Sequence, residues 1–468
     1  MKKWVFLLFF SFLAGCRPPA QPNFDMPCKF SEEKPAYQCH QPEGFIETFW
    51  KQFNDPLLDW LVEEGVSCNF DLLLAKERVC EAKGLYQIEF GKLFPFVDGI
   101  GLFSRKRNSE TLADSPFLGA KFVNIFEIGF DSTWEIDLFG KIRDGKRAAA
   151  YEMMATCDRV FDAQISVISE IARNYVLLRA LQKQYQIAQE QLKNDKELVS
   201  ITLTRYASGL ISELDVWRAQ AIVDRRKAEL PVILIAIKQT IYRIGVLLGR
   251  APEDLLDLLC SPAPIPCADG KIPLCLPCQL LRQRPDIRAA ENELEAAGAR
   301  LLVAKKDLLP SVSLLSSYTW ETGSYSNLFK SASQNWFFFP QISIPLFNAG
   351  VIRGNILVQS AKQKQAVIFY EKIVMEALEE VEMSLAAYFD ETSRYLALED
   401  EVKRNQSAMA IALDQYKAGI ESFEVVIDSE RDLYNAKSQL IDSQEHLMTA
   451  LIAVYKSLGG GWPCSCLP

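Results

Sequence analysis

One stretch of the chain alternates between apolar and polar residues as a half-exposed β-strand does. Between Phe126 and Asp137, apolar residues occupy every second position except Ser132, and the positions between them include three carboxylates. A strand with one apolar and one charged face lies at a boundary between an apolar and an aqueous phase. A soluble β-sandwich is the alternative, but charged inward faces fit the wet lumen of a membrane barrel better than a dry core.

Three further segments are predicted as strands. Residues 311–320 and 341–346 alternate in the same way, and residues 95–105 repeat the segment that begins after Pro310. The predicted strands 95–105, 126–137 and 311–320 are about ten residues long, enough to cross a bilayer at a tilt. The aromatic run at residues 336–339 is expected to form an interfacial girdle. Four strands cannot close a barrel, so three chains are expected to supply twelve.

The rest of the chain is predicted to be long helices. Few helix breakers occur in residues 140–209 and 350–419, and about 65 helical residues would extend about 100 Å. Return helices are expected from about Ser212 and Ser422, which gives two antiparallel hairpins. No run of about eighteen apolar residues follows the first fifteen. The spacing of 4, 3, 4 and 3 typical of a coiled coil occurs at Val374, Leu378, Val381, Leu385 and Tyr388.

The chain is an internal duplication. Arg205–Ser212 recurs as Gln415–Ser422, and three other landmarks recur in the same order. Each half is predicted as helix, strand pair, long helix and helix. Pro285 and Asp286 suit the first turn of the helix that opens the second half. The predicted segments are an N-terminal anchor and extended segment (16–65), a first repeat (66–250), a Pro- and Cys-rich connector (251–279), a second repeat (280–462) and a tail (463–468).

The first residues have the order of an export signal. Lys2 and Lys3 precede a short apolar run that ends in Leu-Ala-Gly-Cys at Cys16. This tetrapeptide resembles the lipobox of bacterial lipoproteins, which implies removal of residues 1–15 and lipidation of Cys16. Arg17 differs from the aspartate that often retains such proteins in the inner membrane, so the outer membrane is favoured. An ordinary secretory leader with an incidental cysteine is the alternative.

Composition removes several classes of function. The 468 residues carry a net charge of −9, or −9 − 2 = −11 without the two leader lysines, and no basic cluster suited to nucleic acid. Twelve cysteines and two histidines favour disulfides or free thiols over a metal site. No nucleotide-binding or nucleophile motif occurs, and His446 is expected to be structural. We therefore expect no catalytic residue, metal or cofactor.

Several blocks together resemble the outer-membrane efflux proteins of the TolC class, in their lipidated OprM-like (NodT-type) branch. They are the lipobox, Trp134–Gly140, Arg282–Glu291, Arg205–Gly209 and Leu458–Trp462. The resemblance implies an α+β membrane protein that assembles as a homotrimer. A twelve-stranded β-barrel would cross the outer membrane, and a coiled-coil tunnel would extend through the periplasm. A periplasmic adaptor and an inner-membrane transporter would complete a pump that exports small molecules passively through this duct.

The resemblance also implies two sites. The first is the pair of hairpin tips, as adaptor-docking surfaces, although their glycines would be needed in any case to turn the chain. The tip residues are Arg205, Tyr206, Gly209, Leu210, Tyr416, Gly419 and Ile420.

The second implied site is a periplasmic gate at Glu424, Asp428 and Arg431. Glu424 stands where OprM-like proteins have a leucine that plugs the pore. Three copies would place six carboxylates near one axis against three arginines, so we expect an electrostatic gate that attracts cations. The alternative is a solvated Asp428–Arg431 pair of small consequence.

Two other classes of protein remain as alternatives. A structural or adhesive lipoprotein could span the periplasm with coiled coils and no pore, although the alternating strands argue against it. An enzyme is the third possibility, without a motif to support it. The exported substrate is beyond what the sequence shows.

Overall fold

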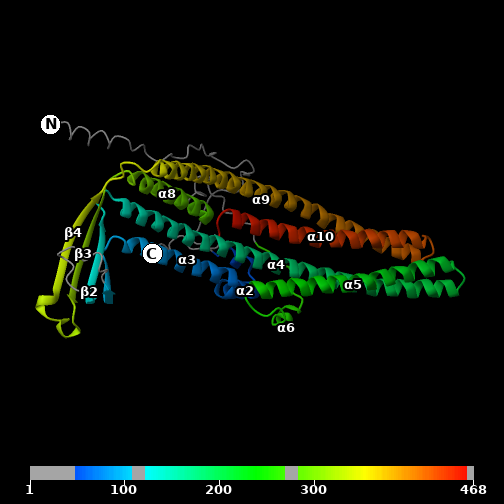
Figure 1. Cartoon of the computed structure of the whole chain (residues 1–468). Helices are drawn as coiled ribbons and strands as arrows, with labels where there is room; N and C mark the ends of the chain where they lie inside the picture. Colours follow the sequence, from blue (N-terminus) through cyan, green and yellow to red (C-terminus); the bar gives the residue numbers. More distant parts are fainter. Residues whose placement is uncertain (1–47, 108–121, 269–282, 461–468) are drawn as a thin grey trace. The chain divides into compact units, whose positions relative to one another are not determined.

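The computed structural model describes residues 48–107, 122–268 and 283–460. The predicted leader, Cys16, residues 269–279 of the predicted connector and the C-terminal tail lie outside the described residues. The chain divides into two compact units, each of which draws on both sequence repeats (Figure 1). The sheet unit contains Arg78–Cys157 and Ala289–Glu371, and the hairpin unit contains the described parts of Phe24–Glu77, Asp158–Arg288 and Lys372–Pro468.

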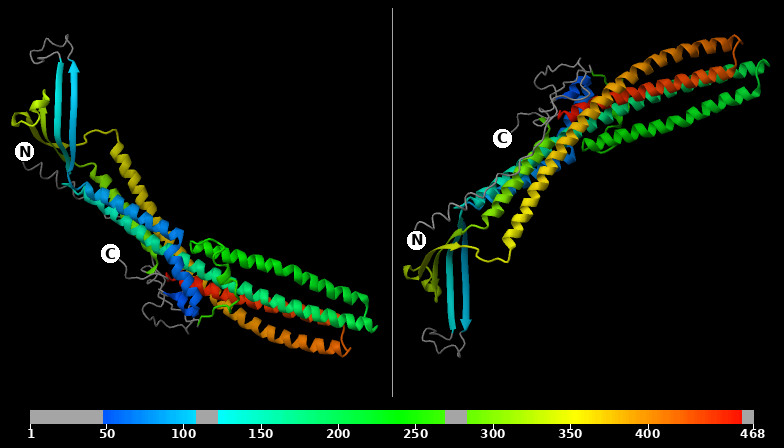
Figure 2. Two further views of the ribbon diagram at one scale, coloured as in Figure 1. Left: turned by 90° about the horizontal axis from the view of Figure 1, so that it is seen from below. Right: turned by 90° about the horizontal axis from the view of Figure 1, so that it is seen from above.

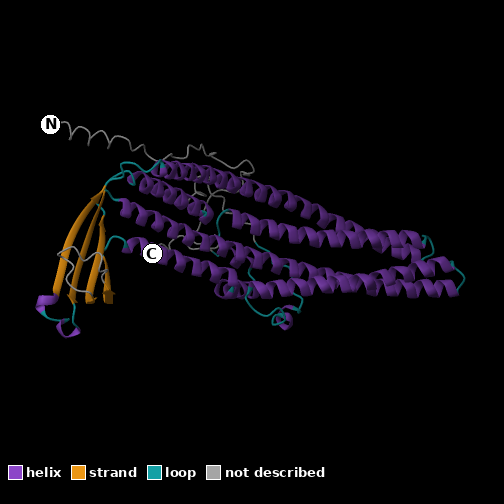
Figure 3. Ribbon diagram, viewed as in Figure 1, coloured by secondary structure: helices purple, strands orange, loops and turns teal. Residues whose placement is uncertain are grey.

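The sheet unit holds one antiparallel sheet with strand order β1-β2-β3-β4. The connection between β3 and β4 lies at one end of the sheet, and the helices join the strands at the other (Figure 3). Within the described residues, β1 and β4 are edge strands, so one chain presents an open sheet. The strands are β1 (Phe96–Arg107), β2 (Phe122–Ile136), β3 (Ser311–Thr322) and β4 (Gln334–Ser343).

The strand register defines two faces of different chemistry. Phe130 pairs with Gly99 and Tyr318, and Tyr318 pairs with Trp336, so these residues share one face. We call it the apolar face; its large side chains include Phe103, Phe126, Ile128, Phe130, Tyr318, Trp320, Trp336 and Phe338. The opposite, acidic face carries Asp98, Glu127, Asp131, Glu135 and Glu321. The predicted division into an apolar and a charged side is confirmed for β2. In contrast, β4 carries no charged residue, and apolar side chains of β1 and β4 also lie on the acidic face.

The predicted aromatic girdle is wrong in part. The run at residues 336–339 lies inside β4, which ends at Ser343, so Ile344 and Leu346 are outside the strand. Consecutive strand residues point to opposite faces. Trp336 and Phe338 therefore lie on the apolar face and the two phenylalanines between and after them on the acidic face, so the run cannot form a one-sided belt.

The helices have the predicted lengths. α4 (Lys141–Ala207) and α9 (Val351–Lys417) have 67 residues each, and α5 (Glu213–Leu247) and α10 (Phe423–Ser457) have 35 each. In the hairpin unit, α4 with α5 and α9 with α10 form two antiparallel hairpins (Figure 2). The shorter helices are η1 (Phe49–Phe53), α2 (Pro56–Cys68), α3 (Phe70–Gly91), α6 (Leu256–Leu259), α8 (Pro285–Lys306), η3 (Tyr325–Asn327) and η4 (Ser331–Ser333). The predicted extended segment is wrong over residues 49–65, where Asp55 caps α2 by accepting from the N–H groups of Leu57 and Leu58.

The block around Asp137 fixes the start of α4. Its carboxylate accepts hydrogen bonds from the backbone N–H groups of Ile142 (3.1 Å) and Arg143 (3.0 Å), which are otherwise unpaired at a helix N-terminus. Lys306 at the end of α8 donates to the carbonyl of Gly140 (3.0 Å) and pairs with Asp144 (2.6 Å). The ends of α4 and α8 are thereby held together directly below the sheet.

The core of the hairpin unit combines residues from both repeats. Phe49 of η1 stacks on Tyr455 of α10, with 5.2 Å between ring centroids. Among the described helices, α5 is long and apolar enough to cross a membrane by composition, which the search for apolar runs did not anticipate. Its Ile237, Ile241 and Ile244 are buried in this core. Only one side of α5 is packed in the single chain, since Val232 and Ile235 are exposed.

In each repeat, the turn after the last helix packs against the residues that precede the first helix, and we call this contact the joint of the repeat. After α5 and α10 the chain turns at Gly249 (φ 68°) and Gly459 (φ 78°). A Cβ atom would lie 2.4 Å from the carbonyl oxygen of Cys68 at the first glycine, and 2.9 Å from that of Gln283 at the second. Only glycine combines this backbone conformation with so close an approach.

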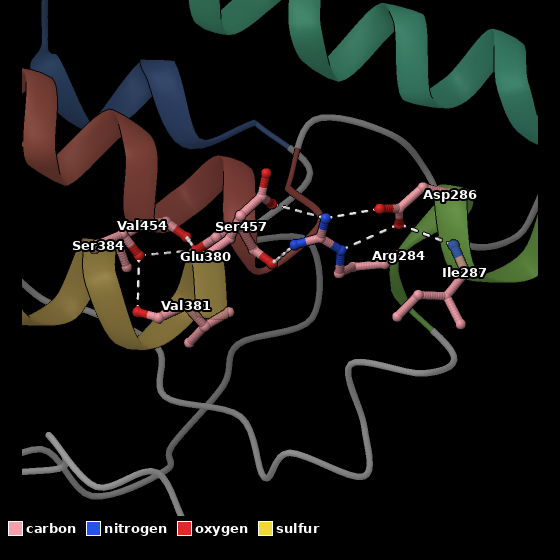
Figure 4. A network of polar contacts seen from close by, with 8 residues as sticks. All are labelled: Arg284, Asp286, Ile287, Glu380, Val381, Ser384, Val454 and Ser457. Atoms are coloured by element: carbon pink, nitrogen blue, oxygen red, sulfur yellow. Dashed lines mark hydrogen bonds and ion pairs between the residues drawn. The ribbon is translucent and has the colours of Figure 1, made fainter. Parts of the chain in front are cut away.

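A side chain beside each glycine ties the helices together. In the first repeat, buried Asn69 donates to the carbonyl of Leu247 (2.8 Å) and accepts from the N–H of Leu72 (3.1 Å). In the second, buried Arg284 donates to the carbonyl of Ser457 (2.9 Å) and pairs with Asp286 and Glu380 (Figure 4). The side chain that completes the first joint is neutral, although Arg250 beside Gly249 pairs with Glu64 (2.6 Å) on its exposed side, whereas the second is an ionic network.

Candidate channel gate and hairpin tips

Both hairpin tips turn in the same way. Gly209 (φ 71°) and Gly419 (φ 77°) have the left-handed conformation that ends a helix. The next residue donates its N–H back into the preceding helix in each tip, from Leu210 to Arg205 (3.0 Å) and from Ile420 to Gln415 (2.9 Å). Leu210 and Ile420 project from the two turns and are 66% and 73% exposed. The structure therefore places an isolated apolar side chain at the apex of each hairpin.

The two tips differ in what they do with their tyrosine. Tyr206 is exposed, whereas Tyr416, at the equivalent position, is buried. The guanidinium of Arg205 lies 4.4 Å above the Tyr416 ring and donates to the Tyr416 carbonyl. This contact links the first hairpin to the second and places a positive charge at the C-terminal end of α9, where the helix dipole favours it. Arg205 and Tyr416 thus hold the tips together, and Tyr206, Leu210 and Ile420 remain accessible.

The predicted gate residues share one exposed face of α10. Glu424, Asp428 and Arg431 are spaced by four and three residues and are all exposed. Arg431 pairs with Asp428 (3.1 Å), with the two side chains 60% and 52% exposed. The pair predicted from the spacing is therefore formed and solvated within one chain.

Sequence reasoning missed one member of this face. Asp432, eight residues after Glu424, continues its four-residue spacing and lies 3.5 Å from Arg431. Each chain therefore presents three carboxylates and one arginine here, and three chains would present nine carboxylates and three arginines. The net charge of the three copies would be −9 + 3 = −6. A search for the i, i+4, i+8 series could have found Asp432.

The other side of α10 carries a buried polar cluster. Glu430 and Asp195 of α4 are both buried, and the side-chain amide of Gln191 contacts both carboxylates. Arg226 of α5 lies 3.4 Å from Asp195 and stacks 3.7 Å above the ring of Tyr434. We call these residues the interhairpin cluster. It joins the first hairpin to α10 on the side opposite the gate face.

Burial is the larger cause and the adjacent Asp195 carboxylate the second, and together they raise the pKa of Glu430 to about 8. Glu430 is therefore largely protonated at neutral pH. Arg226 is shared between Asp195 and Glu229, to which it donates at 2.8 Å, and does not compensate for the full acidic charge. In the sequence, Glu430 resembled any charged position of a coiled coil. Its burial depends on which helix packs opposite it.

These features define a pore-forming membrane protein. An open sheet with one apolar and one acidic face requires further chains to close a barrel, and the helical hairpins belong to an aqueous compartment. The Outer membrane efflux protein family model matches residues 61–250 and 276–460. The chain belongs to this family.

Individual relatives agree over most of the chain. The solvent efflux pump outer membrane protein SrpC of Pseudomonas putida is 32% identical over 414 residues, which are 88% of this chain and 87% of SrpC. The solved outer-membrane channel OprN has a TM-score of 0.88 at 32% identity, over 96% of this chain and 99% of OprN. For the open state of MtrE from Neisseria gonorrhoeae the TM-score is 0.84 at 26% identity, over 96% and 99% of the two chains.

The chain is accordingly an outer-membrane efflux channel of a tripartite pump. Three copies close a twelve-stranded barrel and a helical tunnel, as in the solved channels. The family consists of channels and not of enzymes. The alternative of an adhesive coiled-coil lipoprotein without a pore finds no support among the relatives.

Proposed function

We propose that this channel is anchored by lipid at Cys16, receives an adaptor at its hairpin tips and is closed at its periplasmic end by charge. The gate face of α10 carries the last part of the proposal. Its carboxylates are exposed in the single chain, and the buried side of the same helix determines which way they face. In the trimer this face would line the axis.

The cargo is inferred to be small molecules selected elsewhere in the pump. SrpC is named for solvents, TtgI of P. putida for toluene, and CusC of Escherichia coli for cations. One fold therefore serves cargoes with little chemistry in common. We assign the choice of cargo to the inner-membrane transporter and the passive exit path to this chain.

An electrostatic gate and an apolar plug differ in ion selectivity. Like charges near one axis repel each other and attract cations. Purified trimers in planar bilayers, under a KCl gradient, should show a reversal potential on the cation-selective side. Glu424→Leu should move that potential towards zero and lower the open probability, because it replaces three charges by an apolar constriction. Glu424→Gln should shift selectivity without closing the pore.

Glu421→Leu is the matched control, since Glu421 is exposed three residues earlier and lies outside the gate face. Unchanged selectivity in Glu424→Leu would overturn the electrostatic gate, whereas a channel that never conducts would count against the pore itself. For the anchor, Cys16→Ser should abolish incorporation of labelled palmitate. Labelling that persists would contradict lipidation at Cys16.

A further inference from the structure

The sheet unit contains a large hollow where its helices meet the sheet. Its volume is about 940 Å³, within the range of roughly 300–1,000 Å³ that small-molecule sites occupy. Most of its wall comes from α3, α4, α8 and α9, the four helices that adjoin the strands along the chain (Figure 1), and the rest from the helix ends of β1, β2 and β3. All its lining residues belong to the sheet unit. We call this space the junction hollow.

The junction hollow opens on the acidic face of the sheet. Most of the strand residues that line it lie on that face, as the register shows, and they are Phe96, Thr133, Glu135, Ser313 and Leu315. In the trimer the acidic face borders the water-filled lumen, because the apolar face meets lipid. Neighbouring copies join at the edge strands β1 and β4, beside α3 and α9. We therefore expect them to extend the wall of the hollow and to leave its opening towards the lumen free.

One carboxylate of the junction hollow is not neutralised within the chain. Glu135 is exposed and forms no ion pair with any residue that the structure describes. The other charged residues of the lining are held in ion pairs of 2.6–2.7 Å, which are Lys92–Glu89, Arg300–Glu152 and Lys141–Asp307. The hollow therefore offers a single uncompensated negative charge.

Apolar side chains that remain in contact with water line the same hollow. Leu85 and Ile88 of α3, and Phe94 and Phe96 at the start of β1, are each 53–60% exposed. A ligand with an apolar surface would remove this area from water, and the two phenylalanine rings would attract a cation to their faces. The junction hollow thus combines apolar contact area with one negative charge.

We propose that the junction hollow is a transit site for amphiphilic organic cations, which place an apolar body against α3 and a positive charge beside Glu135. This inference rests on the proposed passage of small molecules through the duct. An organic anion would be repelled by the uncompensated carboxylate, and a neutral apolar molecule would leave that carboxylate without a partner. A small hydrated cation would leave the apolar surface wet. Only a cation with an apolar body uses both parts of the hollow.

Block of the single-channel current tests the site in the intact trimer. The full-length protein is inserted into planar bilayers in KCl, and tetraphenylphosphonium or tetraethylammonium is added at increasing concentration. Both ions carry one positive charge, but only the first carries aromatic rings. The concentration that halves the current should be at least tenfold lower for tetraphenylphosphonium, because its rings bury about 100 Å² more apolar surface.

Two variants separate the charge from the apolar wall. Glu135→Gln should raise the half-blocking concentration of both cations by about two- to fivefold, the range expected of an exposed charge pair. Ile88→Ser should raise that of tetraphenylphosphonium by about threefold or more and leave that of tetraethylammonium unchanged. Glu127→Gln is the matched control, because it removes the same charge from the same face of β2, towards the other end of the sheet. It should change neither concentration.

The outcomes that contradict the site are distinct from those that contradict the channel. Equal shifts in Glu135→Gln and Glu127→Gln would show that the lumen as a whole attracts the cation, and would overturn the site. Equal block of wild type by the two cations would overturn the apolar part of the hollow. A trimer that conducts in KCl without being blocked by tetraphenylphosphonium contradicts this proposal alone, whereas a trimer that never conducts contradicts the proposed function. The conductance of each variant in KCl alone shows that it has assembled.

Discussion

Asn69 and Arg284 occupy the same position in the two repeats, each preceding a helix and donating to the last carbonyl of another. Asn69 reaches Leu247 and Arg284 reaches Ser457, and the acceptors are 210 residues apart, as are the turn glycines Gly209 and Gly419. The amide completes its joint with two neutral bonds. The guanidinium needs Asp286 and Glu380 as well, so its buried contact depends on charge and that of Asn69 does not.

Replacing Arg284 should destabilise the hairpin unit. Arg284→Met leaves the Ser457 carbonyl without its donor and Asp286 without its cation, which should lower the free energy of unfolding by about 3 kcal/mol. Thermal unfolding of trimers in detergent, followed by circular dichroism at fixed protein concentration, measures the change. Arg243→Met is the control, because the Arg243–Glu170 pair (2.7 Å) is half exposed on both sides and should contribute less than about 1 kcal/mol. Equal melting temperatures for the two variants would contradict the assignment.

The interhairpin cluster should make stability depend on pH. The pKa of Glu430 is raised from 4.5 to about 8 by burial and Asp195, so the folded protein retains a proton that the unfolded chain releases. The stability that this proton provides is complete below pH 4.5 and is lost as pH rises to about 8. Glu430→Gln keeps the shape of the side chain but cannot titrate. It should remove the loss and stabilise the protein by a few kcal/mol at pH 8.

Unfolding midpoints measured from pH 5 to 9 test this dependence. Glu190→Gln, at an exposed position of α4 beside Gln191, should retain the wild-type slope. A Glu430→Gln protein whose midpoint falls with pH as steeply as wild type would show that another group carries the effect.

Two glycines with the same backbone conformation should tolerate alanine differently. Gly209 and Gly249 both have φ near 70°, and alanine there costs about 1 kcal/mol. A Cβ at Gly209 meets no described atom within 4 Å, whereas at Gly249 it lies 2.4 Å from the Cys68 carbonyl oxygen. Gly249→Ala should therefore lose a further 1–3 kcal/mol. Denaturant unfolding compares the two, and equal losses would show that the joint after α5 yields easily.

Charge at the hairpin apices should block the adaptor. Leu210→Glu/Ile420→Glu places two carboxylates where exposed apolar side chains stand, and should reduce co-purification of the cognate adaptor at least tenfold because an apolar contact would bury unpaired charge. Folding should be unaffected, since neither side chain is packed. The apolar exchange Leu210→Ile/Ile420→Leu serves as control. Normal adaptor recovery with the charged variant would remove the tips from the docking surface.

Periodicity predicted the elements well because their faces differ in polarity. Alternation located β2 and β3, and the rarity of helix breakers between paired glycines predicted α4 and α9. The predicted belt at residues 336–339 failed because composition was weighed without the two-residue period. Contacts between distant helices were out of reach. Nothing adjacent in sequence distinguishes Glu430, which is buried, from Glu424, which is exposed.

The hairpin tips also contain a contact that the sequence did not predict. Two similar octapeptides predicted two similar surfaces, and the turns are indeed alike. Tyr206 and Tyr416 nevertheless lie in different surroundings, because a single arginine, Arg205, reaches across from one hairpin to the other. Duplication predicts backbone geometry, whereas each copy's neighbours decide which side chains a partner can contact.

The free edges of β1 and β4 make entry into the membrane a collective event. A lone chain would expose a row of unpaired amides to hydrocarbon, at several kcal/mol for each group. Insertion must therefore wait until three chains have met, and the rate of pore formation should rise steeply with their concentration. A cell that makes too little of this protein would hold soluble or lipid-tethered precursors and few pores. Barrels built from fewer than three chains, which would leak, are not stable in the bilayer.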